Sequence, residues 1–263
     1  MITTVEVLFT PAEIALLPKQ DLARTSCVVF DILRATSVFV TALAHGAEAV
    51  QPVTEIAEAL TVRRHYPEVL LAGERQGLRL RASDTGGVDF DFGNSPREFT
   101  PEAVRGQRIV STTTNGTRAL RACTGARQIF AGSFLNLGAT AKHLGQPAPE
   151  RVLLVCAGTG EALALEDVLA AGAFCAALQM IEPTTRLTDS AQVATRSFRT
   201  AETSLPEALA NSTNGRRLLA IPELREDVAY CAQRDVADVV VGLSSEGWLK
   251  RVGDKSPGPA LSA

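Results

Sequence analysis

The chain has 263 residues, of which 46% are apolar and 21% are charged, and its formal net charge is -3. A chain of this length and composition can bury its own core, which excludes a disordered protein and a small disulfide-stapled domain. The five cysteines form no CxxC motif, so neither a disulfide framework nor a zinc knuckle is expected. No apolar run is long enough to span a membrane and the N-terminus does not resemble a signal peptide, so a cytoplasmic protein is expected.

The basic residues are almost all arginine: only four of the 26 are lysine. No basic run exceeds two residues, which argues against nucleic acid as a partner. The planar guanidinium suits two-pronged recognition of phosphate, sulfonate or carboxylate. A GC-rich genome would produce the same bias, so composition leaves both explanations open.

Runs rich in valine, isoleucine and leucine alternate with helical patterns, which is typical of βαβ units and a largely parallel sheet. A first helix is expected over residues 37–45, with Thr36 or Ser37 as its N-cap and Gly46 in the left-handed closing position. A second is expected to begin after Thr54, its candidate N-cap, and to end before Pro67. The predicted fold class is α/β, with largely parallel or mixed sheets flanked by helices. Strands are expected at residues 5–9, 27–30, 49–53, 69–72, 108–111, 128–131, 152–156 and 238–243.

The segment QPAPE at 146–150 is the best candidate for a linker. It predicts a two-lobed arrangement, with an N-terminal α/β lobe over 1–145, a C-terminal α/β lobe over 150–250 and a flexible tail over 251–263. Residues 73–101 are rich in Gly, Asp, Ser, Arg and Pro without periodicity, so a long functional loop is expected there.

Polar residues just past strand ends are candidates for function, because ligands of α/β folds bind at the carboxyl edge of the sheet. In DILRATS (31–37), Asp31 leaves a strand, Arg34 follows and a helix begins near Thr36. Helix amides and the guanidinium can together hold an oxyanion there. A local ion pair between Asp31 and Arg34, with Thr36 as a plain cap, explains the segment equally well.

Three further segments have the same character. In STTTNGTR (111–118), an anion nest or a plain Asn-Gly turn is expected around Asn115 and Gly116. In CAGTGEALALED (156–167), Glu166 and Asp167 can hold Mg²⁺, although the helix dipole alone favours acidic residues in a first turn. The fourth segment is the loop over 73–101, which a plain solvated loop also explains.

Several known chemistries fail on spacing. A haloacid-dehalogenase site needs an Asp where Leu33 stands, and a tyrosine-phosphatase loop headed by Cys156 needs an Arg where Ala162 stands. Neither a phosphate-binding P-loop nor an HExxH motif is present. Cys156 is therefore expected to be a buried structural thiol and not a nucleophile.

Taken together, the motifs resemble those of the 2-phosphosulfolactate phosphatases, the ComB family. The resemblance runs in order from about Val5 to Leu243. Its motifs are DILRATS, GER (73–75), DFGNSP (91–96), TTTNGT (112–117), GSFLN (132–136), CAGT with LED (156–167), NGRRL (214–218) and EDVAYCAQRDVADVV (226–240).

The resemblance implies an uncommon α/β fold and a Mg²⁺-dependent phosphatase that hydrolyses 2-phospho-3-sulfolactate, or a related phosphorylated 2-hydroxy acid, in coenzyme M biosynthesis. The expected partners are this small anionic substrate and a second copy of the chain in a homodimer. Expected roles are catalysis by Asp31, Arg34, Thr36 and Asn115, substrate binding by Arg75, Asn94, Gly116, Thr117 and Arg118, and metal binding by Asp31, Glu74, Glu166 and Asp167.

Two questions stay open at the level of sequence. Water can attack the phosphate directly, or Asp31 can first form an aspartyl-phosphate. A small-anion binding or regulatory protein on the same scaffold is the alternative to the enzyme, and a lyase or isomerase acting on phosphorylated acids is a weaker one. Binding alone would not need Asp31 together with Glu166 and Asp167, so the carboxylates favour the enzyme.

Overall fold

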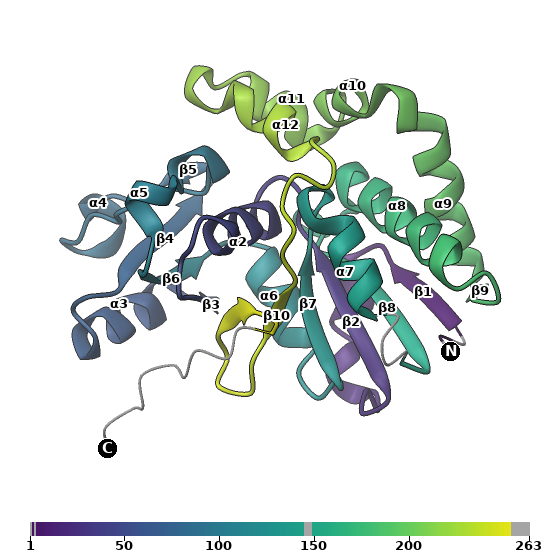
Figure 1. Cartoon of the computed structure of the whole chain (residues 1–263). Helices are drawn as coiled ribbons and strands as arrows, with labels where there is room; N and C mark the ends of the chain where they lie inside the picture. The colour runs from purple at the N-terminus through teal and green to yellow at the C-terminus, as the bar shows by residue number, and fades with distance from the viewer. Residues whose placement is uncertain (1, 3, 145–148, 254–263) are drawn as a thin grey trace.

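The computed structural model describes residue 2 and residues 4–144 and 149–253. Its centre is a sheet of 11 strands in the order β5-β4-β6-β3-β11-β10-β7-β2-β8-β1-β9 (Figure 1). The strands are β1 (Thr4–Leu8), β2 (Thr25–Phe30), β3 (Ala49–Val53), β4 (Leu70–Arg75), β5 (Leu78–Arg79), β6 (Arg108–Thr112), β7 (Gln128–Gly132), β8 (Arg151–Cys156), β9 (Arg186–Leu187), β10 (Val241–Leu243) and β11 (Leu249–Arg251).

Helices flank this sheet, and a group of short helices follows the long pair α8 and α9 along the chain (Figure 1). The α-helices are α1 (Pro11–Ile14), α2 (Ala35–Ala44), α3 (Ile56–His65), α4 (Ala82–Thr85), α5 (Pro101–Val104), α6 (Gly116–Ala122), α7 (Leu137–Leu144), α8 (Leu165–Ile181), α9 (Asp189–Ala201), α10 (Leu205–Ala210), α11 (Thr213–Leu219) and α12 (Arg225–Cys231). The 3₁₀ helices are η1 (Leu17–Lys19), η2 (Pro96–Glu98), η3 (Phe134–Asn136), η4 (Glu202–Ser204) and η5 (Pro222–Leu224).

Apart from the edge strand β5, which is antiparallel to β4, the sheet consists of two parallel blocks joined by an antiparallel hairpin. Strands β4, β6 and β3 are parallel to one another, and so are β7, β2, β8, β1 and β9. The hairpin of β10 and β11 pairs with β7 on one side and with β3 on the other. The expected α/β class with a mixed sheet flanked by helices is confirmed.

The expected division into lobes stays a prediction, but the strand order shows how closely the two sequence halves are interleaved. Strand β8, which follows the expected linker, lies between β1 and β2, which precede it. Residues 146–148 of that linker and residues 254–263 of the expected tail lie outside the described residues.

The central strand β2 is apolar on both faces, as a strand covered on both sides must be. Val28 and Phe30 pack in a cluster with residues of α8 and α9. Cys27 and Val29 point the other way and pack with residues of α2 and α6. Because successive side chains of a strand alternate between faces, this one run of residues serves two cores.

Strands lie at all eight expected places, although β10 covers only the last three residues of the run 238–243. Gly46 has a φ of 97°, which confirms the left-handed closing position after α2. Helix α3 ends before Pro67, as expected. The described residues include no helix with the length and apolar character needed to cross a membrane.

Three local predictions are wrong. Helix α2 begins at Ala35 with Arg34 at its N-cap, because the Thr36 hydroxyl bonds back to Asp31 instead of capping the helix. Helix α3 has Glu55 at its N-cap, and the Thr54 amide donates to the Glu58 carboxylate. The segment 73–101 is not a continuous loop, because it holds the end of β4 together with β5, α4 and η2.

Candidate active site

A cavity of about 310 Å³ lies at the carboxyl ends of several parallel strands. The loops after β2, β6 and β8 line it, as do the end of β4 and residues of α11. This is the edge at which α/β sheets bind their ligands, and the volume suits a small molecule. The lining residues are Asp31, Leu33, Arg34, Glu74, Gln76, Gly77, Asn94, Thr113, Thr114, Asn115, Gly158, Thr159, Gly160, Asn214, Arg217 and Leu218.

Asp31 is fixed directly after β2 by its own loop. The Thr36 hydroxyl accepts a hydrogen bond from the Asp31 amide and donates one to the Asp31 carbonyl, each over 3.0 Å. The Ala35 amide donates to Oδ1 of Asp31 over 3.3 Å. On the other side, a Cβ at Gly116 would lie 2.7 Å from Oδ2 of Asp31, so only glycine leaves room for the carboxylate there. The turn therefore positions Asp31 from two sides.

The negative charge of Asp31 is costly in this position. Burial raises its pKa to about 7, and the charges of Glu74 and Glu166 add to the rise, while the amides of Ala35 and Gly116 oppose it. A carboxyl group disfavoured by burial and by like charges is typical of a functional site. The Gly116 amide therefore stabilises the charged form of Asp31.

Glu74 connects two loops at the rim of the cavity. Its Oε2 accepts the Gly77 amide over 2.6 Å, which closes the turn between β4 and β5. Its Oε1 accepts the amide and the hydroxyl of Thr114 over 3.3 and 3.0 Å. The carboxylate therefore orders the loop after β6 as well as adding negative charge near Asp31.

Glu166 and Asp167 lie in the first turn of α8 and are both buried. Oε1 of Glu166 accepts Nδ2 of Asn214 over 2.6 Å, whereas its buried Oε2 has no partner among the described residues. The two oxygens of Asp167 accept the amides of Ile32 and Gly158, over 2.8 and 3.1 Å. Burial and the charges of Asp31 and Glu166 raise the pKa of Asp167. Asp167 thus pins the loops after β2 and β8 to each other.

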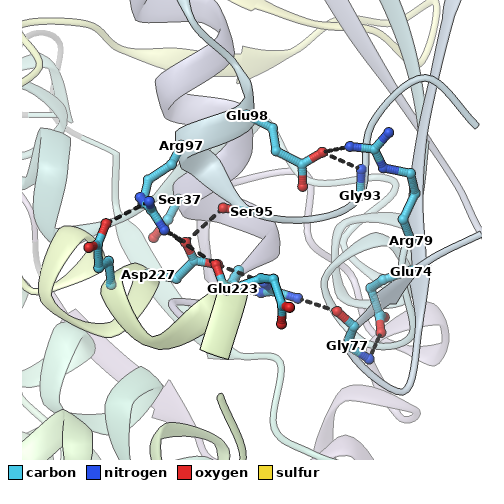
Figure 2. A network of polar contacts seen from close by, with 12 residues as sticks. Ser37, Glu74, Gly77, Arg79, Gly93, Ser95, Arg97, Glu98, Glu223 and Asp227 are labelled. Atoms are coloured by element: carbon cyan, nitrogen blue, oxygen red, sulfur yellow. Dashed lines mark hydrogen bonds and ion pairs between the residues drawn. The ribbon is translucent and has the colours of Figure 1, made fainter. Parts of the chain in front are cut away.

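Arg34 is almost fully buried and faces a carboxylate that sequence reasoning missed. Its Nη1 lies 2.7 Å from Oδ2 of Asp227 in α12, and its Nη2 donates to the Gly77 carbonyl over 2.8 Å. Asp227 also accepts the Ser95 hydroxyl over 2.7 Å (Figure 2). Arg97 reaches the same helix through Glu226 and Asp227. The alternative interpretation from the sequence, a local ion pair between Asp31 and Arg34, is therefore wrong, because Arg34 pairs with Asp227.

Two further buried side chains of the cavity lack partners. Oδ1 of Asn94 and Oγ1 of Thr113 make no hydrogen bond to any described residue. Buried polar atoms are nearly always paired, so unpaired ones lining a cavity indicate a ligand that completes them. They mark where a polar ligand would bind, whereas Glu166, Asp167 and Gly116, which the sequence also proposed, are not among the residues that line the cavity.

The donor set suits a hard divalent cation. Within the described ranges, no group of three or more His, Cys, Asp or Glu side chains is arranged to hold a metal ion. Magnesium does not need one, because it binds through one or two carboxylates and keeps several waters. Oε2 of Glu166 has no partner among the described residues, and the charge of Asp31 is disfavoured by burial, so these two carboxylates fit that requirement. The oxygens of Glu74 and Asp167 already accept hydrogen bonds from backbone amides.

Several residues proposed from the sequence lie outside this cavity. Arg75 bonds to the Glu74 carbonyl and the Thr112 hydroxyl, and Arg118 lines a separate hollow of about 110 Å³ beside Asn115. The Thr117 hydroxyl is buried and donates to the Thr113 carbonyl inside α6. Thr36 donates a hydrogen bond to the Asp31 carbonyl and does not line the cavity.

The residues that sequence reasoning missed come mostly from α11 and α12. Asn214, Arg217 and Asp227 fall within the NGRRL and EDVAYC motifs, to which the sequence alone gives no chemical role. The rule that ligands bind past strand ends does not point to them, since they lie on helices far from any strand in sequence. The family motifs that contain these residues were the only feature of the sequence that could have indicated them.

Cys156 is fully buried at the end of β8. Burial and the charge of Asp167 raise the pKa of its thiol. The thiolate form needed for attack is therefore disfavoured, which supports a structural role.

Comparison with known proteins agrees with the motifs. A family model described as 2-phosphosulpholactate phosphatase matches residues 11–246. A probable 2-phosphosulfolactate phosphatase of Synechococcus sp. strain JA-3-3Ab is 41% identical over 234 residues, covering 86% of this chain and 91% of the relative. A protein of the same description from Thermotoga petrophila is 38% identical over 228 residues, covering 87% of this chain and 93% of the relative.

Proposed function

This chain belongs to the 2-phosphosulfolactate phosphatase family, and on that premise we propose that it is a Mg²⁺-dependent phosphatase of 2-phospho-3-sulfolactate or a closely related phosphorylated 2-hydroxy acid. The observation that carries the proposal is the convergence of three acidic side chains. Asp31 and Glu74 line one cavity with Arg34, and the charge of Glu166 reaches Asp31.

The side chains around the cavity divide the work of binding. Arg34 offers N–H groups beyond those used by Asp227 and Gly77, and Asn94 and Thr113 offer unpartnered polar atoms to the substrate. Asp31 must be unprotonated to act either on a cation or on phosphorus, and its pKa of about 7 places that change near neutral pH. The chain thus orients an anionic ester against a carboxylate.

Asp31 and Glu166 would hold Mg²⁺, because burial disfavours the negative charge of Asp31 and Oε2 of Glu166 has no hydrogen-bond partner among the described residues. When bound, the ion would neutralise charge on the phosphoryl oxygens. Asp167 and Thr36 would keep Asp31 in place through the loop contacts described above.

The direct test is phosphate release from 2-phosphosulfolactate, 2-phospholactate and 2-phosphoglycerate, with Mg²⁺ and with EDTA. Wild-type protein is expected to need Mg²⁺, and Asp31→Asn to lose about a thousandfold or more in kcat, because the amide carries no charge in either role. Asp21→Asn is the matched control, since Asp21 is exposed and bonds to the Ala23 amide.

Near wild-type turnover by Asp31→Asn in saturating Mg²⁺ would overturn the assignment of Asp31. Absence of phosphate release by the wild type from every ester would overturn the phosphatase and favour the anion-binding protein.

A further inference from the structure

Two guanidinium groups line the cavity, and they differ in how their charge is compensated. Arg34 is buried and its charge is matched by Asp227 at 2.7 Å. Arg217 is exposed, and in the part of the chain that the structure describes it forms no ion pair. Arg217 therefore brings an uncompensated positive charge to a cavity whose other charged walls include Asp31 and Glu74.

The position of Arg217 is set by the helix that carries it. Asn214 lies three residues earlier on α11 and therefore on the same face. Its Nδ2 donates to Oγ1 of Thr159 and to Oε1 of Glu166, each over 2.6 Å. Gly215 faces the other way, and a Cβ added to it would meet the Leu209 carbonyl at 1.9 Å. Both faces of α11 are therefore held, and Asn214, Arg217 and Leu218 all line the cavity.

The neighbouring Arg216 is also exposed, but its guanidinium makes a different contact. Arg216 bonds through Nη1 to the Asn211 carbonyl and does not line the cavity. The pair thus provides two adjacent arginines on one short helix, of which one faces the cavity and the other does not.

The proposed substrate carries a phosphate, a carboxylate and a sulfonate on three carbons. The carboxylates at the strand ends repel any substrate anion that a bound cation does not shield. A permanently charged sulfonate therefore needs a cation on another wall, and a guanidinium can bond two of its oxygens at once. Arg217 comes from α11, which lies beyond the strand ends and forms a wall of the same cavity.

We propose that Arg217 binds the sulfonate of the substrate and selects sulfonated over unsulfonated phosphorylated 2-hydroxy acids. The identity of this ligand rests on the proposed function. Asn214 is the positioning residue of this subsite, since it ties α11 to Glu166 and to the loop after β8.

The test compares two esters that differ only in the sulfonate: 2-phosphosulfolactate and 2-phospholactate. In Arg217→Ala, KM for 2-phosphosulfolactate is expected to rise about tenfold or more, the effect of losing a charge-assisted hydrogen bond. KM for 2-phospholactate should change less than about twofold, and kcat on both esters should change little. The control Arg216→Ala should leave both KM values near those of the wild type, whereas Arg217→Lys should restore part of the loss.

A second measurement does not depend on turnover. The product 3-sulfolactate should raise Tm of the wild type and of Arg216→Ala more than lactate does, and this difference should vanish in Arg217→Ala. Equal losses on the two esters, or no loss on either, would overturn the inference while the phosphatase stands. A sulfolactate-specific Tm shift lost in Arg217→Ala, without phosphate release by the wild type, would overturn the phosphatase and uphold the sulfonate site.

Discussion

Asp31 is held in a place that disfavours its charge. Burial and the nearby carboxylates raise its pKa, yet Thr36, Ala35 and Gly116 surround it with backbone and hydroxyl contacts. Asp31 cannot move toward solvent without losing those contacts. A cost of this kind is typical of sites whose charge is neutralised only when ligand binds.

The first prediction concerns this cost. The folded pKa of Asp31, about 7, lies above its ordinary value of 3.8, so the folded state binds the proton more tightly than the unfolded state. Its contribution therefore lowers stability as pH rises from about 4 to about 7, and the loss stays complete above that range. Without metal, Asp31→Asn should gain about 1 to 3 kcal/mol in free energy of unfolding at pH 8.

Urea unfolding in EDTA at pH 5 and pH 8 measures this difference. The gain should be smaller at pH 5, where Asp31 is largely protonated in the folded protein. An equal gain at both pH values would show that removal of a charge is not the cause.

The second prediction concerns Gly116. An alanine Cβ there would lie 2.7 Å from Oδ2 of Asp31 and 2.8 Å from Cβ of Ala35. The carboxylate must give way, so Gly116→Ala should lose tenfold to about a hundredfold in kcat, since a misplaced reacting group costs about that much. The kcat of the purified variant measures this loss.

Gly138→Ala in α7 is the control for Gly116→Ala. Its Cβ would meet Asp235 at 3.0 Å, away from the cavity, and kcat should stay near wild type. Wild-type kcat in Gly116→Ala would show that Asp31 tolerates the crowding.

At the scale of elements, the short helix α12 links parts of the chain that are far apart in sequence. Asp227 joins Arg34 of the loop after β2 to Ser95 of the segment before η2. Arg34 in turn bonds to Gly77, whose amide bonds to Glu74. A change at α12 can therefore alter the cavity through a chain of buried hydrogen bonds.

The third prediction tests this link. Asp227→Asn should destabilise the protein by about 3 kcal/mol, because it leaves the guanidinium of Arg34 buried without its counter-charge. It should also raise KM for the phosphate ester more than it lowers kcat, since the role proposed for Arg34 is binding of the substrate. Urea unfolding and initial rates measure the two effects.

Glu226→Gln is the matched control on the same helix. Its carboxylate is exposed and pairs with Arg97, so it should cost less than about 1 kcal/mol and leave KM unchanged. Equal losses of stability in the two variants would contradict the importance of the buried ion pair between Asp227 and Arg34.

At the scale of the whole molecule, the C-terminal hairpin of β10 and β11 joins the two parallel blocks into one sheet. The loop after β2, in one block, and the end of β4, in the other, both line the cavity. Ligand binding should therefore stabilise the sheet as a whole.

The fourth prediction uses this coupling. Mg²⁺ should raise Tm of the wild type, because a ligand that binds only the folded state stabilises it by mass action. The apparent affinity should increase between pH 6 and pH 8, since Asp31 must lose its proton before it can bind a cation. Thermal unfolding across a Mg²⁺ titration measures both effects.

Asp31→Asn should respond to Mg²⁺ much less, and Asp21→Asn should respond as the wild type does. The same Tm shift in Asp31→Asn as in the wild type would place the cation elsewhere.

The sequence by itself determined the class of fold and the strand-end part of the site. Alternating apolar runs and helical patterns are local signals, so the eight strands could be located without a structure. Asp31, Glu74 and Asn115 could be proposed because each follows or ends a strand, and parallel strands bring their carboxyl ends to one edge. Asn94 could be proposed from the DFGNSP motif in the segment 73–101. The family motifs supplied the chemistry expected there.

Only the tertiary structure decided which residues face one another. Arg34 pairs with Asp227, 193 positions away, and Asn214 reaches Glu166 over 48 positions. Arg75 and Arg118 could be proposed on the same chemical ground as Arg34, yet neither of them lines the cavity. The physical reason is that a charged side chain turns toward the partner that packing brings to it, and packing depends on contacts between elements that no local pattern of residues encodes.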